Sequence, residues 1–140
     1  MSEENKAISK KVYEEVWVKG NLDVVDELFA DDYVNHNQPP NLPRGKEGFK
    51  RMSRMYQSAF PNMKMVVEDL LADGDRVITR WVSTGKHAGE FNGIPATGKD
   101  VRVTGISIDR IAGGKVAESW GEFDLAGLLM QLGVAPPPGG

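Results

Sequence analysis

The side chains best suited to acid–base chemistry are one loop histidine and one aspartate near the end of the chain. His36 stands in the segment DDYVNHN, next to Asn35, and Asp124 follows the last expected strand. A histidine titrates near neutral pH, so His36 could act as an acid, a base or an oxyanion donor, although bonding to backbone or solvent would explain it equally well. Asp124 also fits the N-cap of a closing helix, with Phe123 and Leu128 placed as a hydrophobic staple across it. We expect capping to be the first role of Asp124 and catalysis the second.

The sequence lacks the side chains that several other chemistries require. It contains no cysteine, which excludes disulfides, thiolate chemistry and cysteine-bound zinc. The second histidine, His87, lies in a glycine-rich segment, and neither histidine has a ligand partner at metal-binding spacing. The glycines Gly89, Gly93 and Gly98 lack the strand–turn–helix context of a phosphate-binding loop. We therefore expect no metal and no cofactor.

Length and composition indicate an ordinary globular domain. A chain of 140 residues can bury a substantial core, and its 40% apolar and 26% charged residues are typical of such proteins. The net charge of −3 provides no basic field for nucleic acid. No apolar run approaches the roughly 20 residues that cross a bilayer, and the polar N-terminal residues do not resemble a signal peptide. We expect one domain over residues 1–133, a disordered tail over 134–140, a cytoplasmic location, and neither nucleic-acid nor membrane partners.

The first half of the chain reads as helical. Apolar residues recur at helical spacing in three segments, which are residues 3–18, 22–29 and 45–60. Asn21 is placed to cap the second of these helices. Residues 30–43 contain paired prolines and several turn-forming residues, so we expect an irregular loop there.

The second half reads as stranded, with a short helix at its end. Alternating apolar residues and glycine turns predict two strands and a hairpin, over residues 63–71, 75–86 and 101–123. Residues 87–100 are too rich in glycine for a regular element, and a helix over 125–132 is expected to end at Gly133. Three helices followed by four strands indicate an α+β fold with helices packed on one face of an antiparallel sheet.

Alternation within the hairpin predicts a hollow on one face of the sheet. In the first strand Gly105, Ser107 and Asp109 share a face, and in the second strand Ser119 and Gly121 share one. Small side chains at matched depth leave space above the strands, which predicts the floor of a pocket. Aromatic residues elsewhere could line this pocket, although about half of them are expected to be ordinary core. They are Tyr13, Trp17, Tyr56, Phe60, Trp81 and Phe91.

Four segments then carry a resemblance to a known family: FADDYVNHN, VITRWVSTGKHAGEFNGIPATGK, IDRIAGGKVAESW and FDLAGLLMQLG. In their order and spacing, from about Ala7 to Gly133, they resemble the SnoaL-like polyketide cyclase or ester cyclase branch of the NTF2-like superfamily. The resemblance implies a cone-shaped α+β barrel, with N-terminal helices packed on a curved antiparallel sheet around a deep apolar pocket. It also implies a homodimer formed through the outer face of the sheet.

The resemblance further implies an aldol ring closure that uses neither metal nor cofactor. In the family's cyclases, an aspartate on the last strand is the general acid and base, and a histidine helps it within a His-Trp-Asp pattern. This sequence has Ser119, Trp120 and Gly121 at that place. The tryptophan matches the pattern, whereas the histidine and the aspartate are missing.

Residues and resemblance together predict a protein that binds a small apolar or polyketide-like carbonyl compound. If it is an enzyme, we expect a cofactor-independent cyclase or isomerase of the ester cyclase type, which transfers protons through His36 with Asp124. The expected substrate contacts are Tyr13, Trp17, Asn35, Tyr56, Phe60, Trp81, His87, Ser107, Ser119 and Gly121.

Two other functions stay open. The missing acid–base pair favours a non-catalytic, dimeric module that binds a small molecule. A hydrolase that opens epoxides would need a cation in the pocket, which Arg80 or Arg102 could supply. Alternation turns both arginines away from the small-residue face, so we rank this function last.

Overall fold

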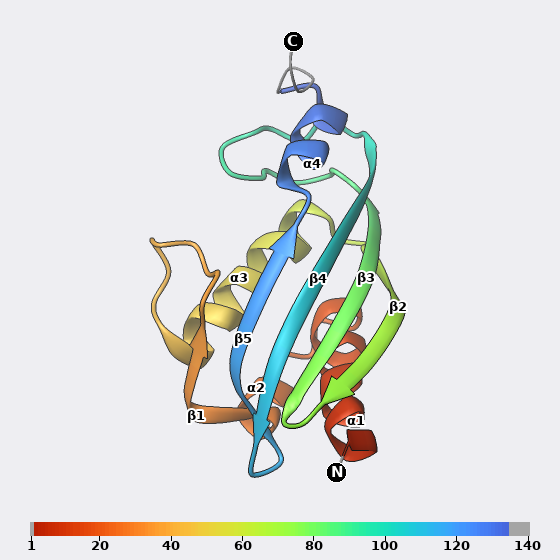
Figure 1. Cartoon of the computed structure of the whole chain (residues 1–140). Helices are drawn as coiled ribbons and strands as arrows, with labels where there is room; N and C mark the ends of the chain where they lie inside the picture. The colour runs from red at the N-terminus through yellow and green to blue at the C-terminus, as the bar shows by residue number, and fades with distance from the viewer. Residues whose placement is uncertain (1, 135–140) are drawn as a thin grey trace.

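The computed structural model describes residues 2–134 and shows helices packed on one five-stranded sheet (Figure 1). The helical elements are α1 (Ser2–Val12), η1 (Tyr13–Val18), α2 (Asp23–Leu28), α3 (Gly45–Ala59) and α4 (Leu125–Leu132). The strands are β1 (Phe29–Asn35), β2 (Lys64–Asp73), β3 (Arg76–Lys86), β4 (Asp100–Ala112) and β5 (Lys115–Phe123). The predicted α+β class is confirmed. The tail expected over residues 134–140 lies, apart from Val134, outside the described residues.

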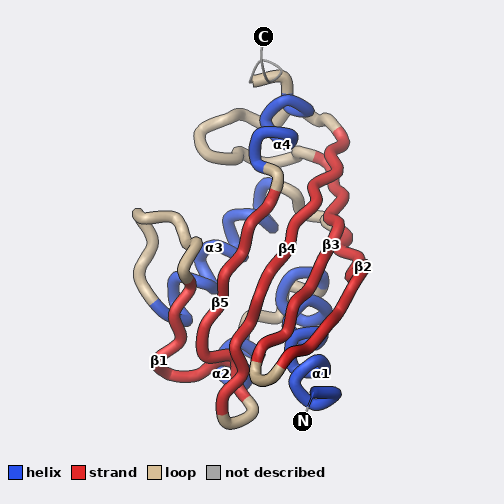
Figure 2. Tube along the Cα trace, viewed as in Figure 1, coloured by secondary structure: helices blue, strands red, loops and turns tan. Residues whose placement is uncertain are grey.

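The sheet has the strand order β1-β5-β4-β3-β2 and is mixed (Figure 2). Strands β2 to β5 pair antiparallel as expected, whereas β1 pairs parallel with β5. Helices α1, α2 and α3 cover one face of the sheet, and α4 lies beyond the end of β5 (Figure 1). None of the helices within residues 2–134 is long and apolar enough to cross a membrane.

Strand β1 corrects the expectation of an irregular loop over residues 30–43. Its backbone pairs with β5 at both ends, Phe29 opposite Val116 and Asn35 opposite Ser119, with an irregular register between them. The two most buried residues of β1 are Phe29 and Tyr33, which are four positions apart. This spacing hides the two-residue alternation of a strand, and two exposed aspartates stand between them.

Both predicted hairpins form at glycine turns. The β4–β5 turn consists of Gly113 and Gly114, with φ of 59° and 77°, between the paired residues Ala112 and Lys115. Glycine reaches this left-handed region without steric cost, so the turn suits the right-handed twist of the flanking strands. Gly74, with φ of 62°, begins the corresponding turn between β2 and β3.

The first predicted helix is continuous in space but changes its winding after Val12. Residues Tyr13–Val18 form a π-helical turn, and Lys19 N–H donates to the Glu14 carbonyl five residues earlier at 3.1 Å. Single π-helical turns often lie at functional sites. Asn21 does not cap α2 as expected, because its side chain reaches back to Glu15 instead.

The segment between β3 and β4 is irregular, as predicted, and forms a closed loop over residues 87–99. Its neck is joined by two backbone hydrogen bonds of 2.8 Å, from His87 N–H to Lys99 and from Gly98 N–H to His87. Ala88 and Gly89 donate to the carbonyl of Ala59, which docks the loop on the end of α3. The loop therefore covers the end of the sheet next to α4 (Figure 1).

Candidate functional site

A cavity of about 440 Å³ lies between the inner face of the sheet and the helices. Every strand contributes to its lining, together with η1, α3 and α4. Its walls are mostly apolar and aromatic, including Phe60, Val103, Phe123 and Leu128. Pockets of this size and character are typical of sites for small molecules.

A carboxyl group lies among these walls. Asp109 projects from β4 into the cavity lining, and only 8% of its surface is exposed. Ser9 of α1 donates a hydrogen bond to Oδ2 and Ser119 of β5 donates one to Oδ1, both at 2.9 Å. Burial raises the pKa of the Asp109 carboxyl above its ordinary value, because it outweighs the two hydroxyl hydrogen bonds, which lower it. A buried carboxyl with a raised pKa is a stronger base than an exposed one, which suits a group that takes a proton from a substrate and returns it.

Two buried tyrosines also line the cavity close to Asp109. Burial, and then the charge of Asp109, raise the pKa of the Tyr13 phenol well above its ordinary value. Burial likewise raises the pKa of Tyr33. Both phenols therefore keep their protons at physiological pH. The Tyr33 hydroxyl is buried and forms no hydrogen bond of standard length and angle among the described residues, although Ser119 lies near enough to lower its pKa slightly against the effect of burial. The hydroxyl can therefore donate to a ligand oxygen.

The hollow predicted above Gly105 is filled. Trp81 stands directly opposite Gly105 in the β3–β4 ladder, and a Cβ on Gly105 would collide with its indole ring. The indole N–H donates to the Ser107 hydroxyl at 3.2 Å, which holds the ring in this place. At Gly121 the space is open, since a Cβ there would meet only the Ser107 hydroxyl at an ordinary 3.6 Å. The small-residue floor therefore begins at Ser107.

Most of the expected substrate contacts lie along this cavity. They are Tyr13, Trp17, Asn35, Tyr56, Phe60, Trp81, Ser107, Ser119 and Gly121. The exception is His87, which is not in the lining. A histidine in a glycine-rich loop is usually exposed, but His87 is fully buried, and its Nδ1 accepts a hydrogen bond from Thr97 N–H at 3.2 Å. Substrate contact itself stays a prediction for all ten residues.

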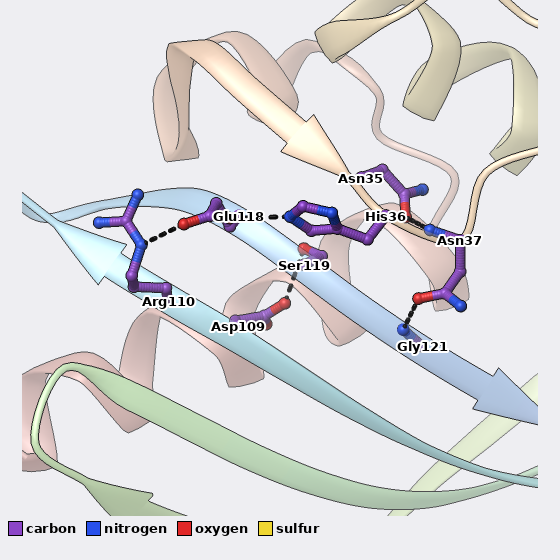
Figure 3. A network of polar contacts seen from close by, with 8 residues as sticks. All are labelled: Asn35, His36, Asn37, Asp109, Arg110, Glu118, Ser119 and Gly121. Carbon is purple, nitrogen blue, oxygen red and sulfur yellow. Dashed lines mark hydrogen bonds and ion pairs between the residues drawn. The ribbon is translucent and has the colours of Figure 1, made fainter.

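His36 and Asp124 are not brought together. The His36 ring stacks on Trp120, with centroids 4.7 Å apart. Figure 3 shows its Nε2 next to Glu118 Oε2, at a distance of 2.7 Å. Asp124 caps α4 and accepts a hydrogen bond from Gly127 N–H at 2.8 Å, so the capping role is confirmed. Neither side chain belongs to the described lining of the cavity. Their catalytic role stays a prediction.

The loop after β1 attaches to the free part of β5. The Asn37 side chain accepts a hydrogen bond from Gly121 N–H at 2.7 Å (Figure 3). It also donates one to Glu122 Oε1 at 3.2 Å. The Asn37 side chain thus continues the pairing with β5 beyond the end of β1. Asn37 and Glu122 both line the cavity, although alternation along β5 puts Glu122 on the side opposite Ser119 and Gly121.

From the sequence we chose His36 and Asp124 as acid–base candidates and missed Asp109. Alternation had already placed Asp109 on the face of Ser107, and an acid on an inward face is a usable signal. Ser9 and Tyr33 were missed as well. Ser9 could have been found from its position, because it is a small polar residue among the apolar positions of a helix, next to Ile8 and near Val12.

A sequence model of the SnoaL-like polyketide cyclases matches residues 7–132 of this chain. The chain belongs to the SnoaL-like polyketide cyclase family. Among the relatives of this SnoaL-like protein, an aklanonic acid methyl ester cyclase from Streptomyces sp. (strain C5) is 29% identical over 122 residues. That match covers 85% of this chain and 76% of the relative.

Solved structures show the same fold. TsrD from Streptomyces laurentii aligns with a TM-score of 0.82 and 30% identity, over 92% of the SnoaL-like chain and 97% of TsrD. IdmH from Streptomyces antibioticus, a proposed polyketide cyclase, aligns with a TM-score of 0.80 and 34% identity, over 93% and 99% of the two chains. These likenesses place the cavity of this SnoaL-like protein in the fold of its family.

Proposed function

We propose that this protein binds a small, apolar or polyketide-like carbonyl compound in the cavity and catalyses a cofactor-free isomerisation or cyclisation by proton transfer. The observation that carries the proposal is the buried carboxyl of Asp109, with its raised pKa, beside two protonated tyrosines within an apolar cavity. Abstraction of a proton from carbon needs a base of raised pKa and a donor for the developing enolate oxygen, and both are present.

In this proposal each group has one role. The carbonyl oxygen of the substrate accepts a hydrogen bond from the Tyr33 hydroxyl, which forms no hydrogen bond of standard length and angle among the described residues, and Tyr13 stands beside it as a second donor. Asp109 takes the proton from the carbon next to the carbonyl, and the electron pair moves to the oxygen as an enolate. In a cyclisation, the enolate carbon attacks an electrophilic carbonyl of the same molecule, the π bond of that carbonyl breaks, and its oxygen takes the proton from Asp109. In an isomerisation, the enolate takes the proton from Asp109 at another carbon. In both outcomes the Asp109 carboxylate is regenerated.

The acid–base group would therefore differ from that of the family pattern. At Gly121 there is no side chain, whereas Asp109 stands on the neighbouring strand and bonds to Ser119, the residue at the place of the family histidine. The carboxyl reaches the same cavity from β4 instead of β5.

Proton exchange tests this without knowledge of the natural substrate. The exchange of the α-protons of 2-tetralone, a neutral bicyclic ketone, is followed by NMR in deuterated buffer. We expect the wild type to accelerate exchange and Asp109→Asn to lose the acceleration, since an amide cannot take the proton. His36→Ala and Asp124→Asn are the matched controls and should keep it. Loss in these two variants, with Asp109→Asn active, would overturn the proposal and restore the pair predicted from sequence.

A non-catalytic binding module is the second candidate, and the absence of the family's histidine and aspartate at Ser119 and Gly121 favours it. The fluorescence of 2-naphthol, a neutral enol mimic, reports binding in the same cavity. Binding that depends on Tyr33 without any exchange of 2-tetralone protons would support the module over the enzyme.

We also propose a homodimer that forms through the outer face of the sheet. Val66, Leu71 and Ile106 lie on this face and are 56%, 59% and 49% exposed. Such exposed apolar residues on a sheet face favour a second copy of the chain as partner. Sedimentation velocity should give a dimer for the wild type and a monomer for Ile106→Glu. A monomeric wild type at tens of micromolar would contradict the proposal.

A further inference from the structure

Ser9 is a buried polar residue on a helix whose inward positions are otherwise apolar. Of the residues of α1, Ser9 and Val12 are buried, and Ser9 is fully inaccessible to solvent. A hydroxyl at such a position is unfavourable unless it is hydrogen-bonded. The Ser9 hydroxyl bonds to Asp109, 100 residues further along the chain.

With this bond, each oxygen of the Asp109 carboxyl accepts a hydrogen bond. Ser9 holds Oδ2 from the helix layer, and Ser119 holds Oδ1 from the neighbouring strand, each at 2.9 Å. One donor on each oxygen fixes the plane of the carboxyl, while each oxygen keeps a lone pair for a proton. A planar group held at one oxygen alone could turn about its Cβ–Cγ bond.

The two hydroxyls matter for the charge of Asp109 because of the groups that surround it. The titratable groups that face Asp109 are Tyr13 from η1 and Tyr33 from β1, and both are neutral donors of raised pKa. Within residues 2–134 no cationic side chain pairs with Asp109. The ionised carboxylate is therefore stabilised in the free protein by hydroxyl hydrogen bonds, to which Ser9 contributes one of two.

We propose that Ser9 is a positioning residue of the active site, which orients the Asp109 carboxyl and favours its ionised, proton-accepting form. Its catalytic consequence rests on the function proposed above, whereas its effect on the carboxyl does not. Ser9 touches no substrate in this assignment and acts through Asp109.

A purely structural role for Ser9, tying α1 to the sheet, predicts a different outcome. The bond would then contribute to the stability of the fold, and its loss would leave the titration of Asp109 where it is. Measurement of that titration therefore separates the two roles.

The experiment is a carboxyl-carbon NMR titration of the full chain, with the Asp109 signal identified by its absence in Asp109→Asn. In Ser9→Ala the pKa of Asp109 should rise by about one unit, because a hydrogen bond to a charged group is worth about 1.5 kcal/mol and 1.36 kcal/mol corresponds to one unit. Ser53→Ala is the matched control. Ser53 is also a fully buried helical serine, but its hydroxyl has no partner among the described residues. In Ser53→Ala the Asp109 signal should titrate as in the wild type.

A second variant keeps the test decisive if Ser9→Ala does not fold. Ser9→Cys has a side chain of similar shape, but its thiol is a weak donor, so it should also raise the pKa of Asp109. The rate of 2-tetralone exchange falls at low pH, where Asp109 is protonated. In either variant the pH of this fall should rise by as much as the pKa measured by NMR. An unchanged Asp109 titration in a folded Ser9 variant would overturn the inference and leave Ser9 a structural anchor. A raised titration in a protein whose wild type catalyses no exchange would uphold the effect on the carboxyl and overturn the proposed function.

Discussion

Replacement of Gly105 by alanine tests how the cavity floor is built. Gly105 lies under the indole of Trp81, and three atoms of the ring lie too close to the position of an added Cβ. Because the backbone of β4 is fixed by pairing on both sides, the ring must move. Its movement breaks the hydrogen bond from the indole N–H to Ser107.

The expected cost follows from three contributions. Insertion of an extra carbon into a packed region costs about 1–3 kcal/mol, and the lost hydrogen bond costs about 1 kcal/mol. Alanine in place of glycine in a strand returns about 0.5–1 kcal/mol. Gly105→Ala should therefore destabilise the protein by about 2 kcal/mol. Gly121→Ala is the matched control on the same face, and it should be neutral or slightly stabilising because its nearest contact is an ordinary 3.6 Å.

Urea unfolding followed by tryptophan fluorescence measures both variants. A double-mutant cycle with Trp81→Ala isolates the cause, since Gly105→Ala should cost nothing once the indole is absent. Equal destabilisation by the two glycine variants would refute the reasoning. So would an unchanged cost of Gly105→Ala in the Trp81→Ala background.

Three further predictions concern the polar groups. The stability of Asp109→Asn relative to the wild type should increase with pH. The increase begins at the ordinary aspartate pKa and ends at the raised pKa of Asp109. The folded wild type holds its proton more tightly than the unfolded chain, so its stability falls across this window; calorimetry from pH 3 to 8 checks this. Tyr33→Phe should change the stability of the fold little, because the lost hydroxyl forms no hydrogen bond of standard length and angle among the described residues, but it should weaken 2-naphthol binding about tenfold by titration. Asp124→Ala removes the cap of α4 and should cost about 1 kcal/mol in urea unfolding, with exchange of 2-tetralone protons retained.

Local signals in the sequence accounted for most of the fold. The four antiparallel strands show clear alternation, and the glycine pair of the β4–β5 turn marks the hairpin without help from the rest of the chain. Strand β1 could not be found in this way. It is held by pairing with β5, where Asn35 lies opposite Ser119, 84 positions later. The residues near Asn35 in the sequence do not indicate this partner.

The candidate site was predicted only in part for the same reason, which is that it depends on contacts between residues far apart in the sequence. Had β1 been recognised, alternation would have turned His36 to the side opposite Asn35, away from the cavity. Alternation did place Asp109 on the inner face, but a strand pattern cannot show which helix residue will meet it. The partnership with Ser9 appears only when α1 is docked on the sheet, and it is this docking that distinguishes a buried acid from an exposed one.

The bond between Ser9 and Asp109 also has a consequence for the folding of the chain. The contact joins the first helix to a strand residue 100 positions later, so it forms only when α1 and β4 have come together. Contacts of such long sequence separation slow folding, because the entropy of closing a long loop is lost before they form. In the unfolded chain Asp109 faces water and titrates as an ordinary aspartate. Between that ordinary pKa and the raised value of the folded protein, folding takes up a proton at Asp109, so the free energy of folding depends on pH.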